Sequence, residues 1–219
     1  INKGPVTTAV GMMLGLAANK RGSCDVTIFK TLCVHIPSLL PTSFRSIDLS
    51  SSVQTAAVAG VGLLCQGSSH RLLTEFLLNE IGKRPTVDQN TDDREGYHLC
   101  CGISLGMVNL CLAESSKQAV NDGLSDLNIE ERLHRYIVGG VDKSFEKHRQ
   151  HNSERTPNSG NIDSERSSRI YEGPMINTDI TAPGATLAVG MIYHRSGSRP
   201  AASLVALPQT LFDLDNVRP

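Results

Sequence analysis

The sequence predicts an all-α protein built from repeated helical hairpins. Four segments rich in glycine, alanine and leucine recur along the 219 residues, and an amphipathic segment follows each of them. Aromatic residues make up only 4% of the chain, and tryptophan is absent. A core of small and aliphatic side chains favours closely spaced helices over two packed sheets.

The four small-residue segments define the repeat. Aligned on the glycine that is followed by Leu or Met, they are anchored at Gly15, Gly62, Gly106 and Gly190. These anchors lie about 45 residues apart, except for a longer interval before the last, and such a period indicates a repeat protein. We expect one repeat domain over 1–219, with units at about 5–37, 53–82, 96–140 and 182–208.

The second half of each unit has the spacing and the end signals of an amphipathic helix. Asp25 and Ser198 precede two of these segments and are predicted N-caps. Asn128 and Glu131 have the spacing of a capping box before a third. We expect the second helix of the second unit to end at Gly82. Each unit is therefore predicted to be a helical hairpin.

The glycines inside the small-residue segments need an explanation, because glycine in a helix interior costs about 1 kcal/mol relative to alanine. Gly102 and Gly106 are four residues apart and share one helix face, where they open a groove for a neighbouring helix. Close packing recovers dispersion contacts that offset this cost. We predict eight such structural helix-packing positions: Gly11, Gly15, Gly60, Gly62, Gly102, Gly106, Gly184 and Gly190.

Two further segments interrupt the helical pattern. Residues 141–173 carry six basic and six acidic residues and few apolar ones, which predicts a flexible insertion. Thr156 in this insertion precedes a proline and fits a proline-directed phosphorylation site, although an unmodified loop is the favoured interpretation. The alternating pattern of 176–181 predicts a short strand, paired with another near 136–140.

Composition and charge disfavour several classes of partner. The net charge is −1, whereas nucleic-acid-binding surfaces are strongly basic, so we expect no nucleic acid. The longest apolar stretch, near 53–65, is interrupted and falls short of the roughly 18 residues that a membrane span needs, so we expect no membrane. The six cysteines form no CxxC pair and are predicted to be reduced thiols of an intracellular protein. The chain begins with Ile1, and we expect it to be part of a longer protein.

No motif for catalysis, cofactor binding or metal binding emerges. The lysine of "GLAANKRGS", Lys20, precedes its second glycine and does not fit a phosphate loop. The glycines of "GVGLLCQG" lack the dinucleotide spacing. His98, Cys100 and Cys101 lack a second pair of ligands for structural zinc. We therefore predict no catalytic residue, no cofactor and no metal. An all-helical enzyme stays open as an alternative, which would need a pocket lined by convergent polar groups.

Six stretches resemble the proteasome/cyclosome repeat family. They are "AVGMMLGLAANKRG", "VHIPSLLP", "TAAVAGVGLLCQGSSHR", "LLNEIGKRP", "LSDLNIEERLHRYIVGG" and "INTDITAPGATLAVGMIY", and they extend over almost the whole chain. The resemblance implies an α–α hairpin solenoid that closes into a toroid in the complete protein. Cys100 and Cys101 depart mildly from the pattern, since the family tends to have alanine-sized residues there.

The match is closest to the cyclosome branch of this family. It implies a non-catalytic scaffold in a cell-cycle ubiquitin ligase, the anaphase-promoting complex, with that complex's other subunits and its co-activator as partners. It also implies a location in the nucleus and cytoplasm. The alternative is the proteasomal branch, a scaffold of the regulatory particle that docks ubiquitin-like domains.

Overall fold

The computed structural model of the chain describes residues 5–41, 49–84, 94–112, 123–141, 175–205 and 210. Helices make up most of these residues and no strand occurs in the described ranges, so the predicted all-α class is confirmed. The α-helices are α1 (Val6–Asn19), α2 (Val26–Cys33), α3 (Ser51–Leu64), α4 (Arg71–Ile81), α5 (Arg94–Val108), α7 (Ile129–Val138), α9 (Thr178–Ile192) and α10 (Arg199–Leu204). Two short 3₁₀ helices, η1 (Pro37–Leu39) and η4 (Ser125–Leu127), lie between them.

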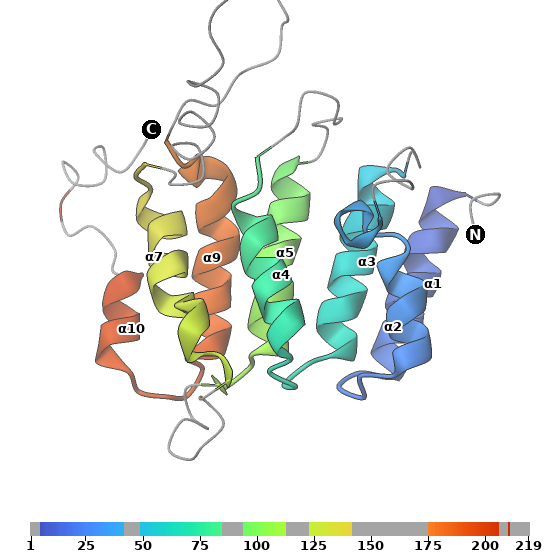
Figure 1. The fold of residues 1–219 in the computed structure, drawn as a ribbon, viewed down its shortest axis with the longest axis horizontal. Coiled ribbons are helices and arrows are strands. Elements are labelled where there is room, and N and C mark those ends of the chain that lie inside the picture. The colour runs from blue at the N-terminus through green and yellow to red at the C-terminus, as the bar shows by residue number, and fades with distance from the viewer. Residues whose placement is uncertain are drawn as a thin grey trace, which may run out of the picture.

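The α-helices stand side by side in two layers, with the first helices of the four hairpins forming one layer (Figure 1). In that layer α1 contacts α3, α3 contacts α5, and α5 contacts α9. The second helices form the other layer, where α2, α4 and α7 each pack against the first helix of the following hairpin. Each hairpin is thereby locked to the next by both of its helices.

A single apolar core runs through these layers. Its most buried large side chains include Leu32, Leu64, Leu77, Leu105 and Leu133. They come from five different helices, so the core crosses the boundaries between hairpins. Burial of a leucine side chain contributes about 1.5–3 kcal/mol, and here that contribution depends on neighbouring hairpins being in place.

The predicted helix caps are correct at two of three positions. The Asp25 carboxylate accepts hydrogen bonds from the backbone N–H groups of Thr27 (2.9 Å) and Ile28 (3.2 Å). The Ser198 hydroxyl accepts from the N–H of Ala201 at 3.3 Å. The predicted capping box at Asn128 is wrong, because its backbone is left-handed (φ 47°) and its side chain makes no cap bond.

The predicted strands near 136–140 and 176–181 are wrong. Helix α7 continues through Val138, and α9 already begins at Thr178. Pro183 lies inside α9, more than one turn after the helix begins, although proline is usually found in the first turn of a helix. What remains of the predicted pairing is one isolated bridge, between Val141 and Met175.

The turns inside the hairpins repeat the same backbone geometry. Gly22 and Gly67 both have a left-handed backbone (φ 73° and 70°), three residues before the N-cap of the second helix. The Gly22 N–H donates to the Leu63 carbonyl (3.1 Å), and the Gly67 N–H donates to the Met107 carbonyl (2.9 Å). Cys111, also left-handed, donates in the same way to the Met191 carbonyl at 3.2 Å.

These inter-hairpin hydrogen bonds end on carbonyl groups in the last turn of a first helix, where the regular hydrogen bond from the residue four positions later is missing. They also correct the alignment of the first repeat. Since Gly22 corresponds to Gly67, Ala17 rather than Gly15 occupies the place of Gly62. Ala17 is fully buried, and Gly62 is buried at the equivalent position of the second repeat.

Several predictions fall outside the described residues. The predicted insertion at 141–173 is described only at Val141, so Thr156 and its surroundings are not covered. Within the described ranges, no helix is both long and apolar enough to cross a membrane.

Candidate functional site: the contacts between hairpins

Helices α5 and α9 cross at their backbones, at Gly102 and Gly184. A Cβ atom on Gly102 would overlap the carbonyl group of Gly184. In return, a Cβ on Gly184 would lie 2.9 Å from the His98 carbonyl oxygen and 3.3 Å from the Leu99 Cα. Backbone atoms cannot rotate away as a flexible side chain can. Only glycine fits at this crossing, which belongs to the most extensive helix pair of the described fold.

Three more of the predicted glycines lie where a neighbouring helix approaches closely. A Cβ on Gly62 of α3 would lie 2.7 Å from the Cβ of Ser104 in α5. One on Gly106 would lie 2.7 Å from the sulfur of Met191 in α9. At Gly60 the contact is softer, with the nearest atom of Leu32 at 3.1 Å. The row of first helices is thus held at close range at each described junction from α3 onward.

The other three predicted glycines make no such contact within the part of the chain that the structure describes. A Cβ on Gly11, Gly15 or Gly190 would meet nothing within 4 Å, so close helix packing at these three positions stays a prediction. The reason is their position in the row. Gly11 and Gly15 lie on the exposed side of α1, and Gly190 lies on the exposed side of α9.

A glycine outside the small-residue segments also serves packing. Gly82 ends α4 as predicted, but its backbone is not left-handed (φ −95°). A Cβ there would lie 2.5 Å from the ring of Tyr136, whose hydroxyl donates to the Leu78 carbonyl at 2.9 Å. Gly82 therefore provides the space for a tyrosine of the next hairpin.

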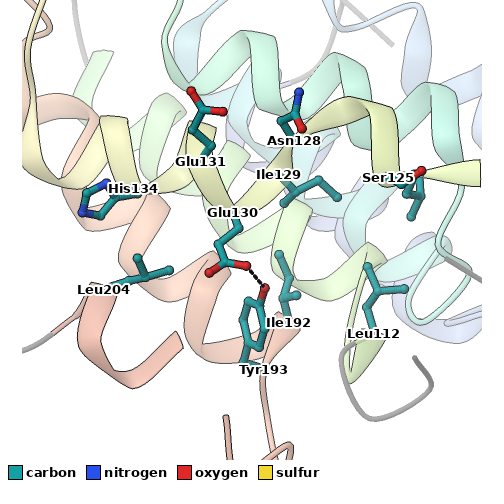
Figure 2. A pocket seen from close by; sticks show the side chains of 11 residues that line it. Leu112, Ser125, Asn128, Ile129, Glu130, Glu131, His134, Ile192, Tyr193 and Leu204 are labelled. Atoms are coloured by element: carbon teal, nitrogen blue, oxygen red, sulfur yellow. Dashed lines mark hydrogen bonds between the residues drawn. The ribbon is translucent and has the colours of Figure 1, made fainter. Parts of the chain in front are cut away.

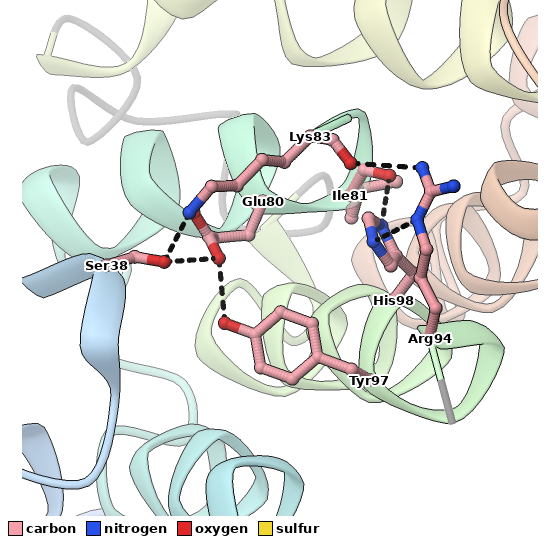
Figure 3. Close-up of polar contacts among 7 residues, drawn as sticks. All are labelled: Ser38, Glu80, Ile81, Lys83, Arg94, Tyr97 and His98. Carbon is pink, nitrogen blue, oxygen red and sulfur yellow. Dashed lines mark hydrogen bonds and ion pairs between the residues drawn. The ribbon is translucent and has the colours of Figure 1, made fainter. Parts of the chain in front are cut away.

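A buried carboxylate joins the first three hairpins (Figure 3). Glu80 of α4 is only 5% exposed. Its Oε2 accepts from the hydroxyls of Ser38 (2.9 Å) and Tyr97 (2.7 Å), and its Oε1 pairs with the Lys83 ammonium at 2.9 Å. Lys83 also donates to the Ser38 hydroxyl. The charge is buried with its partners supplied, which is the condition under which burial of a carboxylate is tolerated.

The Tyr97 hydroxyl stays protonated in this cluster. Burial raises its pKa well above the usual value, and the negative charge of Glu80 acts in the same direction. Tyr97 therefore serves as a fixed hydrogen-bond donor to the carboxylate.

His98 is engaged on both of its ring nitrogens. Its Nδ1 lies 2.8 Å from the Ile81 carbonyl oxygen, and its Nε2 accepts from the Arg94 guanidinium at 3.4 Å. A carbonyl can only accept, so Nδ1 carries the proton. With Nε2 acting as an acceptor, the ring is neutral and bridges α5 to the end of α4. Among the described residues, no group of three His, Cys, Asp or Glu side chains is placed to hold a metal ion.

All six cysteines are free thiols, and four of them are held protonated. Burial raises the pKa of Cys33 and Cys100 to about 11 and that of Cys65 to about 12, with a hydrogen bond to Cys24 adding to the shift at Cys65. Cys101 is fully buried, and burial raises its pKa well above the usual value of a thiol. A nucleophilic cysteine needs a thiolate, so these four are packing residues.

An open groove with a volume of about 560 Å³ lies between α7, α9 and α10 (Figure 2). Its apolar lining comes from Leu112, Leu124, Ile129, Ile192 and Leu204. Its polar edge carries Glu130, Glu131 and His134 on α7, and Tyr193 at the end of α9. The Tyr193 hydroxyl donates to the Glu130 carboxylate at 3.0 Å.

Sequence reasoning missed Glu80, Tyr97 and this groove. Glu80 lies 42 residues from Ser38 and 17 from Tyr97, so no local pattern shows that they meet. The groove is formed by segments from the last two hairpins. The signal that was available is the position of Glu80 between the apolar residues Leu78 and Ile81, which places it beside the buried face of its helix.

Comparison with known proteins gives a consistent family. Residues 26–219 match the family model described as the APC1 fifth domain. Anaphase-promoting complex subunit 1 of Homo sapiens is 40% identical over 220 residues, which cover 100% of this chain and 10% of that protein. The same-named protein of Arabidopsis thaliana is 35% identical, with 97% of this chain and 12% of that protein covered. "Negative regulator of mitosis" of Emericella nidulans is 30% identical, with 97% and 9% covered. The chain thus spans about a tenth of the length of these relatives.

Proposed function

Because the chain belongs to the anaphase-promoting complex subunit 1 family, we propose that it is part of a non-catalytic scaffold subunit of that complex. The complex is a cell-cycle ubiquitin ligase, and the scaffold holds its catalytic and substrate-recognition parts together. Ubiquitin transfer belongs to other components. The partners of this protein are then the other subunits of the complex and its co-activator.

The observation that carries the proposal is the backbone crossing of α5 and α9 at Gly102 and Gly184. Together with the close approaches at Gly62 and Gly106, it joins successive hairpins with little room for one to slide on another. Such interlocked hairpins form an extended framework on which other proteins are positioned. The described polar clusters support the same role, because the hydrogen bonds of Glu80 and His98 link one hairpin to another.

We further propose that this row is part of a longer solenoid or toroid. The exposed sides of α1 and α9 carry Gly11, Gly15 and Gly190, and the corresponding faces inside the row carry the close helix contacts. Further hairpins would cover both faces in the complete protein. The relatives named above favour the anaphase-promoting complex over the proteasomal alternative. The free thiols support a reducing compartment, in the nucleus and cytoplasm.

The test introduces Gly102→Leu into the full-length subunit, with Gly96→Leu in the same helix as the matched control. A Cβ at Gly96 would meet nothing within 4 Å. We expect tagged Gly102→Leu protein to recover the other subunits of the complex in greatly reduced amounts, while Gly96→Leu protein recovers them as the unmodified protein does. Native mass spectrometry and immunoblotting of each subunit's abundance provide the measurement.

Two outcomes would contradict the proposal. One is full recovery of the complex by a Gly102→Leu protein whose α5 and α9 exchange their amide hydrogens faster than in the unmodified protein. The other is an assembled complex that keeps all of its subunits and loses only ubiquitin transfer, since that points to a catalytic role.

A further inference from the structure

We propose that the groove between α7, α9 and α10 binds a peptide segment of another protein that carries leucine-sized apolar side chains and a lysine or arginine. This inference rests on the geometry of the groove and does not depend on the proposed scaffold role. It goes beyond that role, because it states which chemical groups one bound partner would present.

The floor of the groove accounts for the apolar part of this partner. Ile129 of α7 and Leu204 of α10 are only partly buried, and both line the groove together with Ile192 of α9 (Figure 2). With a volume of about 560 Å³, the groove has the size of clefts that enclose organic ligands or several side chains. Its apolar lining gains from contact with apolar side chains and has nothing to offer a strongly hydrated ligand.

The edge of the groove accounts for the basic part. Glu130 and Glu131 are exposed on α7. Glu131 already pairs with Arg135 at 3.0 Å. Glu130, by contrast, accepts a hydrogen bond from the neutral Tyr193 hydroxyl and has no basic partner at ion-pair distance among the described residues. The Tyr193 hydroxyl stays protonated and can donate this hydrogen bond, because burial and the neighbouring carboxylate raise its pKa to about 12.

Tyr193 thus holds the Glu130 carboxylate at the edge of the apolar floor without neutralising its charge. A cation that approaches Glu130 lies at the edge of the apolar floor, where Ile129 and Leu204 are partly exposed, and lysine and arginine have apolar stems that cover such a surface. The Glu130 carboxylate disfavours anionic ligands such as nucleic acids and phospholipid headgroups. A basic, leucine-containing peptide satisfies the floor and the edge together, which is how amphipathic segments dock in grooves.

The test uses three synthetic 12-residue peptides on the purified full-length protein. The first combines leucines at helical spacing with lysines and carries a benzophenone photo-crosslinker. The second keeps the leucines and crosslinker but has glutamate for lysine, and the third keeps the lysines but has serine for leucine. After irradiation, mass spectrometry locates the crosslinked residues. We expect crosslinks from the first peptide within 124–134 or 192–204, and at least about tenfold less from the other two.

Charge variants of the protein separate this site from general attraction to acidic surfaces. Glu130→Lys should lower the yield of the first peptide about tenfold and Glu130→Gln several-fold, since the glutamine keeps the shape but loses the charge. Glu75→Lys, an exposed glutamate of α4 outside the groove, is the matched control and should leave the yield unchanged. Crosslinks located elsewhere, equal yields from the leucine and serine peptides, or equal effects of Glu130→Lys and Glu75→Lys would each overturn the proposal.

Discussion

At the scale of single residues, the α5–α9 crossing divides the glycines of one helix into two kinds. Gly102 faces the backbone of α9, and Gly96, six residues earlier in α5, faces open space. The same change at the two positions therefore has opposite consequences. At Gly96 a methyl group reduces the entropy that the chain loses on folding, while at Gly102 it forces two backbones apart.

We predict that Gly102→Ala lowers the free energy of local unfolding of α5 and α9 by about 1–3 kcal/mol or more, which is the usual cost of overpacking. Gly96→Ala should raise it by up to about 1 kcal/mol, because alanine is the better helix former. Hydrogen exchange of the full-length protein, followed by mass spectrometry of peptides from both helices, measures both changes. Equal protection in the two variants would show that the helices do not cross at Gly102.

A second pair of residues separates a buried hydrogen bond from an exposed one. Tyr97→Phe removes the 2.7 Å bond to the buried Glu80 carboxylate, and hydrogen bonds to charged groups are worth about 1.5–3 kcal/mol. Tyr193→Phe removes a 3.0 Å bond to the exposed Glu130 and should cost under about 1 kcal/mol. We expect faster hydrogen exchange in α4 and α5 for the first variant only. Similar exchange in both variants would mean that Glu80 is reached by water.

At the scale of helices, capping varies from one hairpin to the next and gives a matched comparison. The Asp25 side chain caps α2 with two hydrogen bonds, whereas the Ser50 side chain, at the same position before α3, makes none. Asp25→Ala should therefore destabilise α2 by about 1 kcal/mol. Ser50→Ala should leave α3 nearly unchanged. Hydrogen exchange within the first turn of each helix is the measurement, and a larger effect at Ser50 would refute the capping assignment.

Helices and their ends could largely be predicted from the sequence, because these depend on neighbouring residues. The pattern around Leu73, Leu77 and Ile81 specifies α4, and Asp25 is recognisable as a cap without any tertiary information. The start of α9 could not be predicted in this way, because it depends on a contact with another hairpin. Local alternation in 176–181 suggested a strand, but Thr181 donates its hydroxyl to the Tyr136 carbonyl (2.7 Å), a contact between hairpins that no local pattern reveals.

At the scale of the whole molecule, the repeat could be predicted but its exact register could not. In the structure, the left-handed turns at Gly22 and Gly67 set the register between the first two repeats, and this register aligns Ala17 with Gly62. An alignment on glycines alone places Gly15 there, because it ignores the position of the turn. The candidate groove could not be predicted at all, since its walls come from α7, α9 and α10. Residues that act across hairpins, such as Glu80 and Tyr136, have the same long-range origin.

The buried thiols predict how the whole framework responds to alkaline pH. Cys65 and Cys33 have folded pKa values of about 12 and 11, both above the ordinary value of 9.0. Above pH 9 the unfolded chain releases these protons and the folded chain keeps them. Unfolding is therefore favoured increasingly as the pH rises from 9 towards 11–12, and the stabilising effect of the protonated thiols is complete below pH 9.

Alkylation by iodoacetamide, read by mass spectrometry, checks this prediction. Between pH 7 and 9 we expect Cys65 in the native protein to react far more slowly than the same residue in denaturant, with the difference shrinking above pH 10. Cys65→Ala should weaken the loss of stability at high pH. Rapid alkylation of native Cys65 at pH 8 would show that the thiol is not buried as described.

The hydrogen bonds from Gly22, Gly67 and Cys111 lie where each hairpin turns, and they bind each turn to the hairpin that follows. Alignment along the row is thus set at that edge, by backbone groups that every amino acid except proline possesses. The connections from one hairpin to the next leave from the opposite helix ends and take no part in these bonds. Outside Ser38 and Lys83, which bind Glu80, a change in the length of those connections therefore leaves these three turn-to-hairpin bonds in place.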